Sequence, residues 1–248
     1  MTIVNHMINI TLGKSAARAW GGEKVKAADF DYVRPYCIEE VLAVLAEYGE
    51  DAKIIAGGQS LVPMLNMRFA RPDVLVDINQ IDVLSGIELL AGNRLRIGAL
   101  TRHAAIASSD LIARHAPLLT KAAPYIAHEA IRNRGTIGGS LVTADPAAEW
   151  PACCLALNAR IVLRSQRGER TVAAEDFFQG VYETATEPDE LLVAVEIPVL
   201  QKGQRIGFAE LARRKGDYAI VGLAAQCEIK RSGLLRRGEA HFHGMKLA

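Results

Sequence analysis

The spacing of apolar residues predicts an amphipathic helix near the start of the ordered part of the chain. Between residues 38 and 48, apolar side chains recur at intervals of three and four residues, and glutamates occupy the opposite face. Gly49 follows directly and is expected to end the helix. Cys37 precedes it where Ser, Thr or Asp would cap the free amides better, so the start should be poorly capped.

Short apolar runs predict strands elsewhere in the chain. In chain order they are residues 53–56, 74–77, 95–97 after a Gly92-Asn93 turn, 161–163, 191–197 and 207–211. Helices are expected over 101–108 with Thr101 as the cap, over most of 111–127, and from Asp145-Pro146 into the run that holds Cys153 and Cys154. Because strands and helices mix without strict alternation, the pattern favours an α+β fold over a doubly wound sheet.

Length and charge narrow the possible functions. A chain of 248 residues has room for one large domain or two small ones. Its 29 Lys and Arg against 28 Asp and Glu give a net charge of +1, so we expect no nucleic-acid partner. The longest run without a charge, residues 54–67, is interrupted by Gly57, Gly58 and Pro63, and no membrane span is predicted.

Cysteine and histidine spacing does not predict a metal centre. The four cysteines are Cys37, Cys153, Cys154 and Cys227, and they form no C-x-x-C pair. The adjacent pair lies in an apolar run, so we interpret these thiols as buried core residues and not as disulfide or iron–sulfur ligands. His241 and His243 could share one strand face, but without a third ligand we interpret them as a surface or strand-end pair.

Residues 1–27 are interpreted as an N-terminal extension. Gly13-Lys14-Ser15 mimics the end of a phosphate-binding P-loop, but the required earlier glycine is replaced by Ile8, so we regard the likeness as chance. The segment also lacks the pattern of a secretory signal, and we expect a cytoplasmic protein.

Two glycine pairs carry the most informative chemistry. The first loop follows a predicted strand and comprises Ile54, Ile55, Ala56, Gly57, Gly58, Gln59 and Ser60; the second comprises Thr136, Ile137, Gly138, Gly139 and Ser140. Glycine permits close backbone approach and positive φ, which a diphosphate requires, although a single loop of this kind also suits an ordinary tight turn. Neither loop matches G-x-G-x-x-G or the P-loop pattern. Together they suggest a cofactor held by two converging loops. Arg132 and Arg134 could contact a phosphate directly, or they could only solvate the loop or pair with acidic side chains.

From about residue 30 to 227, the sequence resembles the FAD-binding medium subunit of molybdenum hydroxylases, of the xanthine dehydrogenase and aerobic carbon monoxide dehydrogenase type. The matching motifs are Phe30-Asp-Tyr-Val-Arg-Pro35, Ala56-Gly-Gly-Gln-Ser60, Val76-Asp-Ile-Asn79, Ile97-Gly-Ala99, Arg132-Asn-Arg-Gly-Thr-Ile-Gly-Gly-Ser140, Ala144-Asp-Pro-Ala-Ala-Glu-Trp-Pro151, Asp176-Phe-Phe-Gln-Gly180, Val195-Glu-Ile-Pro198 and Arg213-Arg-Lys-Gly-Asp-Tyr-Ala219. So many motifs in the same order make the resemblance specific.

The resemblance implies a fold and a set of cofactor contacts. It implies a two-lobed α+β FAD-binding domain of the PCMH type over residues 28–203, followed by a small α+β C-terminal subdomain, here truncated, over 204–248. We expect that second part to leave apolar strand surface exposed. The family's two glycine loops hold the flavin diphosphate and neighbouring groups, its acid at Glu149 contacts the adenosine side, and its aliphatic residue at Leu192 contacts the flavin. A lysine that some relatives place near the flavin is replaced within Phe208-Ala-Glu210, so that contact is not carried over.

The same resemblance implies a role in electron transfer. The chain would be the FAD-dependent oxidoreductase subunit of a complex, with molybdopterin on a large partner subunit and [2Fe-2S] centres on a small one. Electrons would reach FAD from those centres and leave to an external acceptor, and the expected assembly is a dimer of heterotrimers. No residue of this chain is assigned a catalytic role. Two alternatives stay open: a flavin-dependent dehydrogenase of the same fold acting alone, and a degenerate, truncated subunit that no longer holds FAD.

Overall fold

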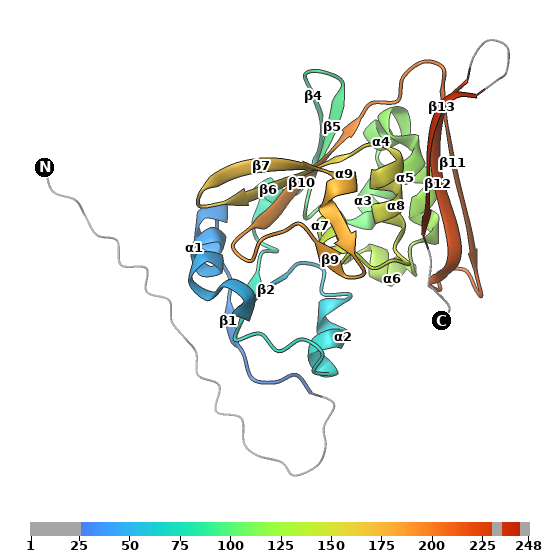
Figure 1. Cartoon of the computed structure of the whole chain (residues 1–248). Helices are drawn as coiled ribbons and strands as arrows, with labels where there is room; N and C mark the ends of the chain where they lie inside the picture. Colours follow the sequence, from blue (N-terminus) through green and yellow to red (C-terminus); the bar gives the residue numbers. More distant parts are fainter. Residues whose placement is uncertain (1–25, 230–234, 244–248) are drawn as a thin grey trace, which may run out of the picture.

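The computed structural model describes residues 26–229 and 235–243, which form sheets on both sides of a layer of helices (Figure 1). The strands are β1 (Asp31–Val33), β2 (Ala52–Ile55), β3 (Val74–Asp77), β4 (Ile87–Leu90), β5 (Arg94–Gly98), β6 (Arg160–Ser165), β7 (Gly168–Ala173), β8 (Phe178–Gly180), β9 (Glu183–Thr184), β10 (Leu191–Pro198), β11 (Gln204–Ala212), β12 (Ala219–Ile229) and β13 (Leu235–His243). The helices are α1 (Ile38–Tyr48), α2 (Leu61–Asn66), α3 (His103–Ser108), α4 (Asp110–His115), α5 (Pro117–Ala122), α6 (Glu129–Arg132), α7 (Ile137–Thr143), α8 (Glu149–Ala156) and α9 (Ala174–Phe177), with 3-10 turns η1 (Gly49–Asp51), η2 (Asp82–Leu84) and η3 (Ala123–Tyr125). Most of the predicted N-terminal extension, including Gly13-Lys14-Ser15, lies outside the described residues.

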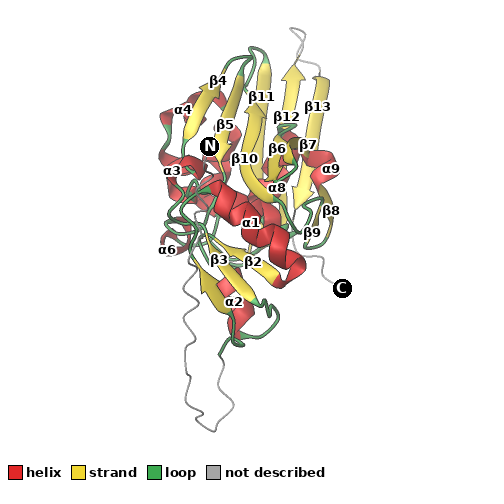
Figure 2. Ribbon diagram, turned by 90° about the vertical axis from the view of Figure 1, so that its left-hand side faces the viewer, coloured by secondary structure: helices red, strands yellow, loops and turns green. Residues whose placement is uncertain are grey.

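A small N-terminal lobe is built on a parallel sheet in the order β1-β3-β2 (Figure 2). The predicted helix of this lobe is confirmed as α1, which ends at Gly49 and begins after Cys37 without a side-chain cap bond. Its apolar face packs against β3 and against Val162 and Leu191 of the central sheet. The small lobe is therefore attached to the rest of the molecule through a second hydrophobic core.

The central sheet is antiparallel, in the order β4-β5-β10-β6-β7, and is covered on both faces. Its strand β10 is buried at nearly every position because the two cores lie on opposite sides of it. Leu192 and Val195 face the helices, whereas Val193 and Ala194 both face the small lobe, since the β10–β6 register shifts between Leu192 and Ala194. This bulge lets one strand serve two cores.

Helices α3 to α8 fill the space between the central sheet and a third sheet, β11-β12-β13 (Figure 1). Strand β11 alternates regularly between half-buried and exposed positions, as a strand with one covered face does. On the uncovered side, Leu211 is 60% exposed and Val221, its cross-strand neighbour, is 45% exposed. The expected exposed apolar strand surface is thus present among the described residues.

Two predicted helix starts are wrong. Helix α3 begins after Arg102, because the Thr101 hydroxyl is bonded to the backbone N–H and carbonyl of Gly86 at 3.1 and 3.0 Å and is not free to cap. Helix α8 begins at Glu149 and not at Asp145, whose carboxylate accepts from the N–H of Ala147 at 2.8 Å and closes a turn before the helix. The stretch 111–127 is helical as expected, although it breaks before Pro117 into α4, α5 and η3.

The interpretation of the adjacent cysteines is confirmed. Cys153 and Cys154 are fully buried within the main core, and all four cysteines are free. His241 and His243 belong to β13, but their side chains lie outside what the structure describes. No grouping of three metal-binding side chains occurs within residues that the structure describes. In that same part of the chain, no helix has the length and apolar character needed to cross a bilayer.

Candidate cofactor-binding site

The first glycine loop packs against the residues directly before the second. The first loop lies between β2 and α2, whereas the second comprises Thr136 and the first turn of α7. A Cβ atom on Gly57 would stand 2.2 Å from the carbonyl oxygen of Arg134 and 2.8 Å from the Cα of Gly135, so glycine is required there. The structure therefore brings together two loops that are far apart in the sequence.

The first loop offers free backbone donors. Within the described residues, the N–H groups of Gly58, Gln59 and Ser60 donate no hydrogen bond, and all three residues are at least partly accessible. Gly58 has a φ of +71°, and the Gln59 side chain closes the turn by donating to the carbonyl of Gly57 at 2.8 Å. Consecutive free amides around a residue with positive φ form a concavity that binds anions.

The second loop is organised differently, because its amides are already occupied. The N–H groups of Ile137 and Gly138 donate to carbonyls of the segment after β5, at 3.1 and 2.9 Å. The N–H of Gly139 donates to the Thr136 hydroxyl at 3.2 Å, which caps α7. Thr136, Ile137 and Gly138 are buried, whereas Gly139 is exposed and Ser140 is half-buried. This loop presents a helix end and a serine hydroxyl to solvent, without a row of free amides.

The remaining predicted residues lie behind these loops. Ile54 and Ile55 are half-buried in β2, and Ala56 follows them at the start of the first loop. Leu192 is 4% exposed and lies in the main core together with Ile137 of the second loop. The Leu192 side chain is therefore buried and does not reach the molecular surface.

Glu149 is the first residue of α8 and is only 8% exposed. Burial raises the pKa of its carboxyl to about 7, and the nearby charges of Glu210 and Asp145 act in the same direction. Its neighbour Trp150 donates from the indole N–H to Nδ1 of His103 at 2.8 Å. Helix α8 is therefore tied to the element that supports the second loop.

The His103 ring is packed against Gly135, where a Cβ atom would stand 2.6 Å from Nε2. Burial, followed by the charges of Arg102 and Arg132, lowers the pKa of His103 to about 4, so the ring is neutral at physiological pH. Because Nδ1 accepts the bond from Trp150, the hydrogen-bond pattern assigns the ring proton to Nε2. A neutral, fixed ring at this point keeps the second loop close to the helices.

A chain of polar side chains connects the two loops. Asn79 donates from Nδ2 to the carbonyl of Ala56 at 2.7 Å, and its Oδ1 accepts from Arg102 at 2.8 Å. Arg102 also donates to the carbonyl of Arg134. Asn79 ends the matching motif Val76-Asp-Ile-Asn79, but sequence patterns assigned neither Asn79 nor Arg102 a role at the site.

Asp77 anchors the far end of this chain. It accepts hydrogen bonds from the Tyr32 hydroxyl and from both the backbone and side-chain nitrogens of Asn79. Burial acts to raise the pKa of Asp77, but the hydrogen bonds from Tyr32 and Asn79 outweigh it and hold the pKa below its usual value. The carboxylate therefore stays ionised and fixes the orientation of the Asn79 amide.

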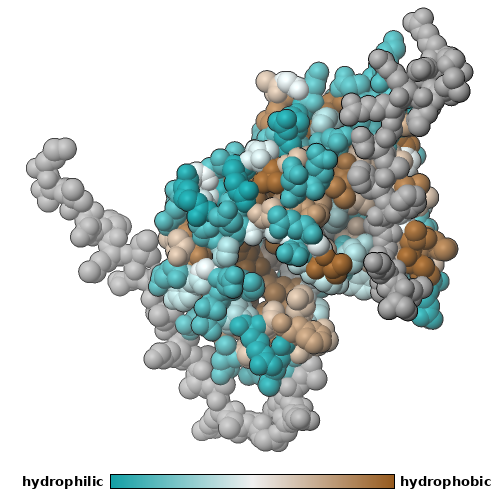
Figure 3. All heavy atoms as spheres, viewed as in Figure 1, coloured by the Kyte–Doolittle hydropathy of each residue, from teal (hydrophilic) through white to brown (hydrophobic). Residues whose placement is uncertain are grey.

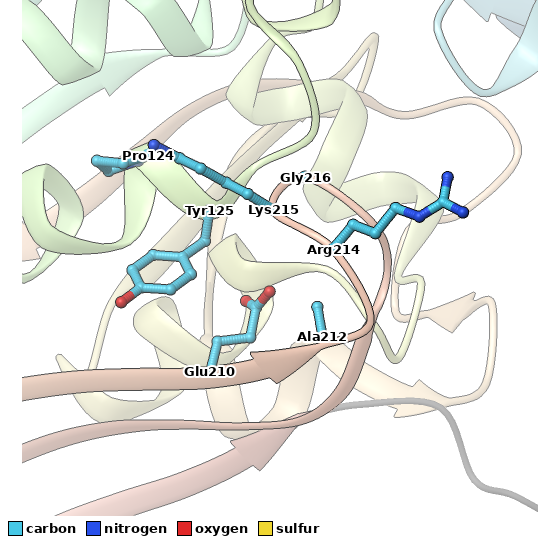
Figure 4. A pocket seen from close by; sticks show the side chains of 7 residues that line it. All are labelled: Pro124, Tyr125, Glu210, Ala212, Arg214, Lys215 and Gly216. Carbon is cyan, nitrogen blue, oxygen red and sulfur yellow. The ribbon is translucent and has the colours of Figure 1, made fainter.

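An open pocket of about 500 Å³ lies between η3 and the β11–β12 turn (Figure 4). Its lining comprises Pro124, Tyr125, Glu210, Ala212, Arg214, Lys215 and Gly216. Burial raises the pKa of the Glu210 carboxyl to about 7. The charge of Glu210 also helps to raise the pKa of Glu149, which the sequence predicts to bind the cofactor.

Free backbone amides in the first loop, with a glycine-rich segment packed against it, are features expected of a site for a phosphate-bearing cofactor. Comparison with known proteins identifies the cofactor. Residues 28–200 match the family described as the FAD binding domain in molybdopterin dehydrogenase. The chain belongs to this family, which confirms the predicted resemblance, the α+β class and FAD as the cofactor.

Individual relatives agree with this assignment. The chain is 46% identical over 213 residues to the 6-hydroxypseudooxynicotine dehydrogenase complex subunit alpha of Paenarthrobacter nicotinovorans, covering 86% of this chain and 72% of that protein. It is 31% identical to the xanthine dehydrogenase FAD-binding subunit of Escherichia coli O157:H7, covering 80% and 68%. A solved structure of carbon monoxide dehydrogenase from Hydrogenophaga pseudoflava aligns with a TM-score of 0.84 at 38% identity, covering 88% of this chain and 75% of that chain. These relatives are subunits of dehydrogenases.

Proposed function

We propose that the chain is the FAD-carrying electron-transfer subunit of a molybdenum hydroxylase complex. Bound FAD would supply the redox chemistry, taking up electrons that [2Fe-2S] centres on a partner subunit relay from the oxidised substrate and passing them to an external acceptor. The observation that carries the proposal is the accessible row of free amides at Gly58, Gln59 and Ser60, held against a second glycine loop.

The geometry supports different roles for the two loops. We assign the diphosphate to the first loop, over Ile54 to Ser60, because the amides of its last three residues are free and Gly58 has a positive φ. In the second loop, over Thr136 to Ser140, the exposed Gly139 backbone and the Ser140 hydroxyl are the groups that can reach the cofactor. Glu149 on the adenosine side and Leu192 near the flavin remain part of the proposed site.

The proposed partners are a large molybdopterin subunit and a small [2Fe-2S] subunit, assembled as a dimer of heterotrimers in the cytoplasm. Support comes from relatives that are named as chains or subunits of dehydrogenases, such as the carbon monoxide dehydrogenase medium chain of Hydrogenophaga pseudoflava. We also propose that residues 28–203 form the FAD-binding unit and that 204–248 belong to a separate C-terminal subdomain, because β11, β12 and β13 form a sheet of their own.

A visible spectrum of the purified chain tests the proposed cofactor. We expect flavin absorption bands corresponding to about one FAD per chain, either as isolated or after incubation with FAD and removal of the excess. A folded, colourless chain that takes up no FAD under these conditions would refute the proposal.

The substitution Gly58→Val tests the placement of the diphosphate. Valine is strained at a φ of +71°, and its Cβ would stand 3.1 Å from Cγ2 of Val62, so the amide row should lose its shape. We expect loss of flavin retention on gel filtration with the far-UV spectrum unchanged. The matched control is Gly207→Val, because Gly207 has nothing within 4 Å of its Cβ position and lies in strand β11, where valine is favourable. Equal flavin retention in the two variants would show that the diphosphate binds elsewhere.

A further inference from the structure

We propose that Arg102 is a positioning residue that holds the two glycine loops at the spacing required by the cofactor. The inference rests on the proposed FAD site, but it assigns Arg102 no contact with the cofactor itself. Arg102 lies between β5 and α3 and is half-buried, and its backbone also forms an isolated bridge with Thr136 of the second loop.

The Arg102 guanidinium forms hydrogen bonds with two groups, one connected to each glycine loop. Its Nη1 donates to the carbonyl of Arg134, which directly precedes Gly135. Its Nη2 donates to Oδ1 of Asn79 at 2.8 Å. A planar guanidinium holds two acceptors in a fixed relative geometry, which the single ammonium group of a lysine cannot do.

Asn79 transmits this constraint to the first loop. Its Nδ2 donates to the carbonyl of Ala56, which directly precedes Gly57, and to Oδ1 of Asp77, both at 2.7 Å. The bond from Nδ2 to the Asp77 carboxylate fixes the amide so that its oxygen faces Arg102. A continuous series of hydrogen bonds therefore runs from the Ala56 carbonyl of the first loop to the Arg134 carbonyl, two residues before the second loop.

The fixed spacing matters because the loops belong to different parts of the fold. The first loop leaves the small parallel sheet, whereas the second connects helices packed on the central sheet (Figures 1 and 2). Gly57 touches the Arg134 carbonyl, but packing alone limits only how closely the loops approach each other. The bonds of Arg102 limit how far they separate, because hydrogen bonds from a charged donor are the stronger ones.

The full-length chain carrying Arg102→Met tests the proposal. The matched control is Arg164→Met, because Arg164 also joins the central sheet to the small lobe, through Glu39 of α1 at 2.9 Å, but does not touch either loop. The first measurement is amide hydrogen exchange at Ile78 and Gly138. The N–H of Ile78 donates to Ile55 of the first loop, and Gly138 belongs to the second loop and donates to Ala99. We expect exchange to accelerate at both sites in Arg102→Met and at neither site in Arg164→Met.

The second measurement is the dissociation constant for FAD, obtained by titration of the flavin-free chain. We expect Arg102→Met to weaken binding by about 10- to 100-fold, the range of a lost hydrogen bond to a charged group. Arg102→Lys, which can keep one of the two bonds, should fall between wild type and Arg102→Met, and it provides the same comparison if Arg102→Met does not fold. Adding Asn79→Ala to Arg102→Met should weaken binding little further, because both residues act through the same series of bonds.

The two measurements separate this inference from the proposed function. Faster exchange at both sites supports the positioning role even if wild type binds no FAD, and in that case only the proposed function fails. Unchanged exchange overturns the positioning role whether or not FAD binds. Weaker FAD binding with unchanged exchange also overturns it, because Arg102 would then act by touching the cofactor.

Discussion

The substitution Glu149→Gln should stabilise the fold at neutral and alkaline pH, because it removes a buried negative charge from the start of α8. Glu149 is 8% exposed, and burial raises the pKa of its carboxyl from the ordinary 4.5 to about 7. The folded chain therefore binds this proton more tightly than the unfolded chain. Between pH 4.5 and 7 the folded state holds more protons, so the contribution of Glu149 to stability falls as pH rises and stays low above pH 7.

The magnitude follows from the shift. A change of one pKa unit corresponds to 1.36 kcal/mol, so ionised Glu149 costs roughly 3 kcal/mol of unfolding free energy at pH 8. Gln has nearly the same shape and never ionises. The stability of Glu149→Gln relative to wild type should therefore increase by roughly 3 kcal/mol between pH 4.5 and pH 8. This is a large fraction of the about 5–15 kcal/mol by which a typical domain is stable.

Urea unfolding of the flavin-free chain, followed by far-UV circular dichroism at several pH values, measures this difference. His103 contributes with the opposite sign, because its lowered pKa makes stability rise with pH between about 4 and 6.5. That contribution is common to both proteins and cancels in the difference. As a matched control, Glu129→Gln alters the first residue of α6, an exposed helix start, and should change the pH dependence far less. If Glu149→Gln and wild type keep the same stability difference from pH 4.5 to pH 8, the buried environment inferred for Glu149 is wrong.

Two further substitutions test the packing and the ion pairs. Gly57→Ala should lower the unfolding free energy, measured in urea, by about 1–3 kcal/mol, because the new Cβ would overlap the carbonyl of Arg134. The control Gly207→Ala should be nearly neutral, because its Cβ would enter open space. Equal effects of the two substitutions would contradict the close approach of the loops. Arg170→Met should lower the unfolding free energy by about 1–2 kcal/mol at pH 7. Glu190 is 5% exposed and accepts from Arg170 at 2.6 and 2.7 Å, but the Arg170 side chain is 43% exposed and solvent screens the pair. A loss below about 0.3 kcal/mol in the same assay would show that the pair does not stabilise the fold.

Local patterns predicted the elements that are stabilised locally. Helix α1 was predicted with its observed bounds because its apolar spacing and terminal Gly49 lie within one short segment. Helix α7 was not predicted, because Gly138 and Gly139 are poor helix formers and give no local signal. Tertiary contacts stabilise α7 instead: Thr136 caps it, and Gly138 fits against Ala99, where a Cβ atom would stand 2.7 Å away.

The same distinction explains the wrong helix start at Thr101. A threonine before a helical pattern is a good cap candidate when only neighbouring residues are considered. The Thr101 hydroxyl, however, is occupied by the backbone of Gly86, fifteen positions earlier in the chain. A side chain that can satisfy either a local or a distant partner cannot be assigned from spacing alone.

The candidate site shows that a glycine motif alone does not determine whether its backbone amides are free to bind a ligand. The sequence indicated that both glycine loops could bind a diphosphate, because glycine pairs with polar neighbours look alike in sequence. In the structure the Gly58 amide is free, while the Gly138 amide is bonded to the Ala99 carbonyl at 2.9 Å. Which amides are free depends on neighbours from distant segments, and so does the position of the first loop relative to the second. Arg102 therefore belongs to the inferred site as much as the glycines do. Its hydrogen bonds set the distance between the first loop, whose amides are free, and the second loop, whose amides are occupied.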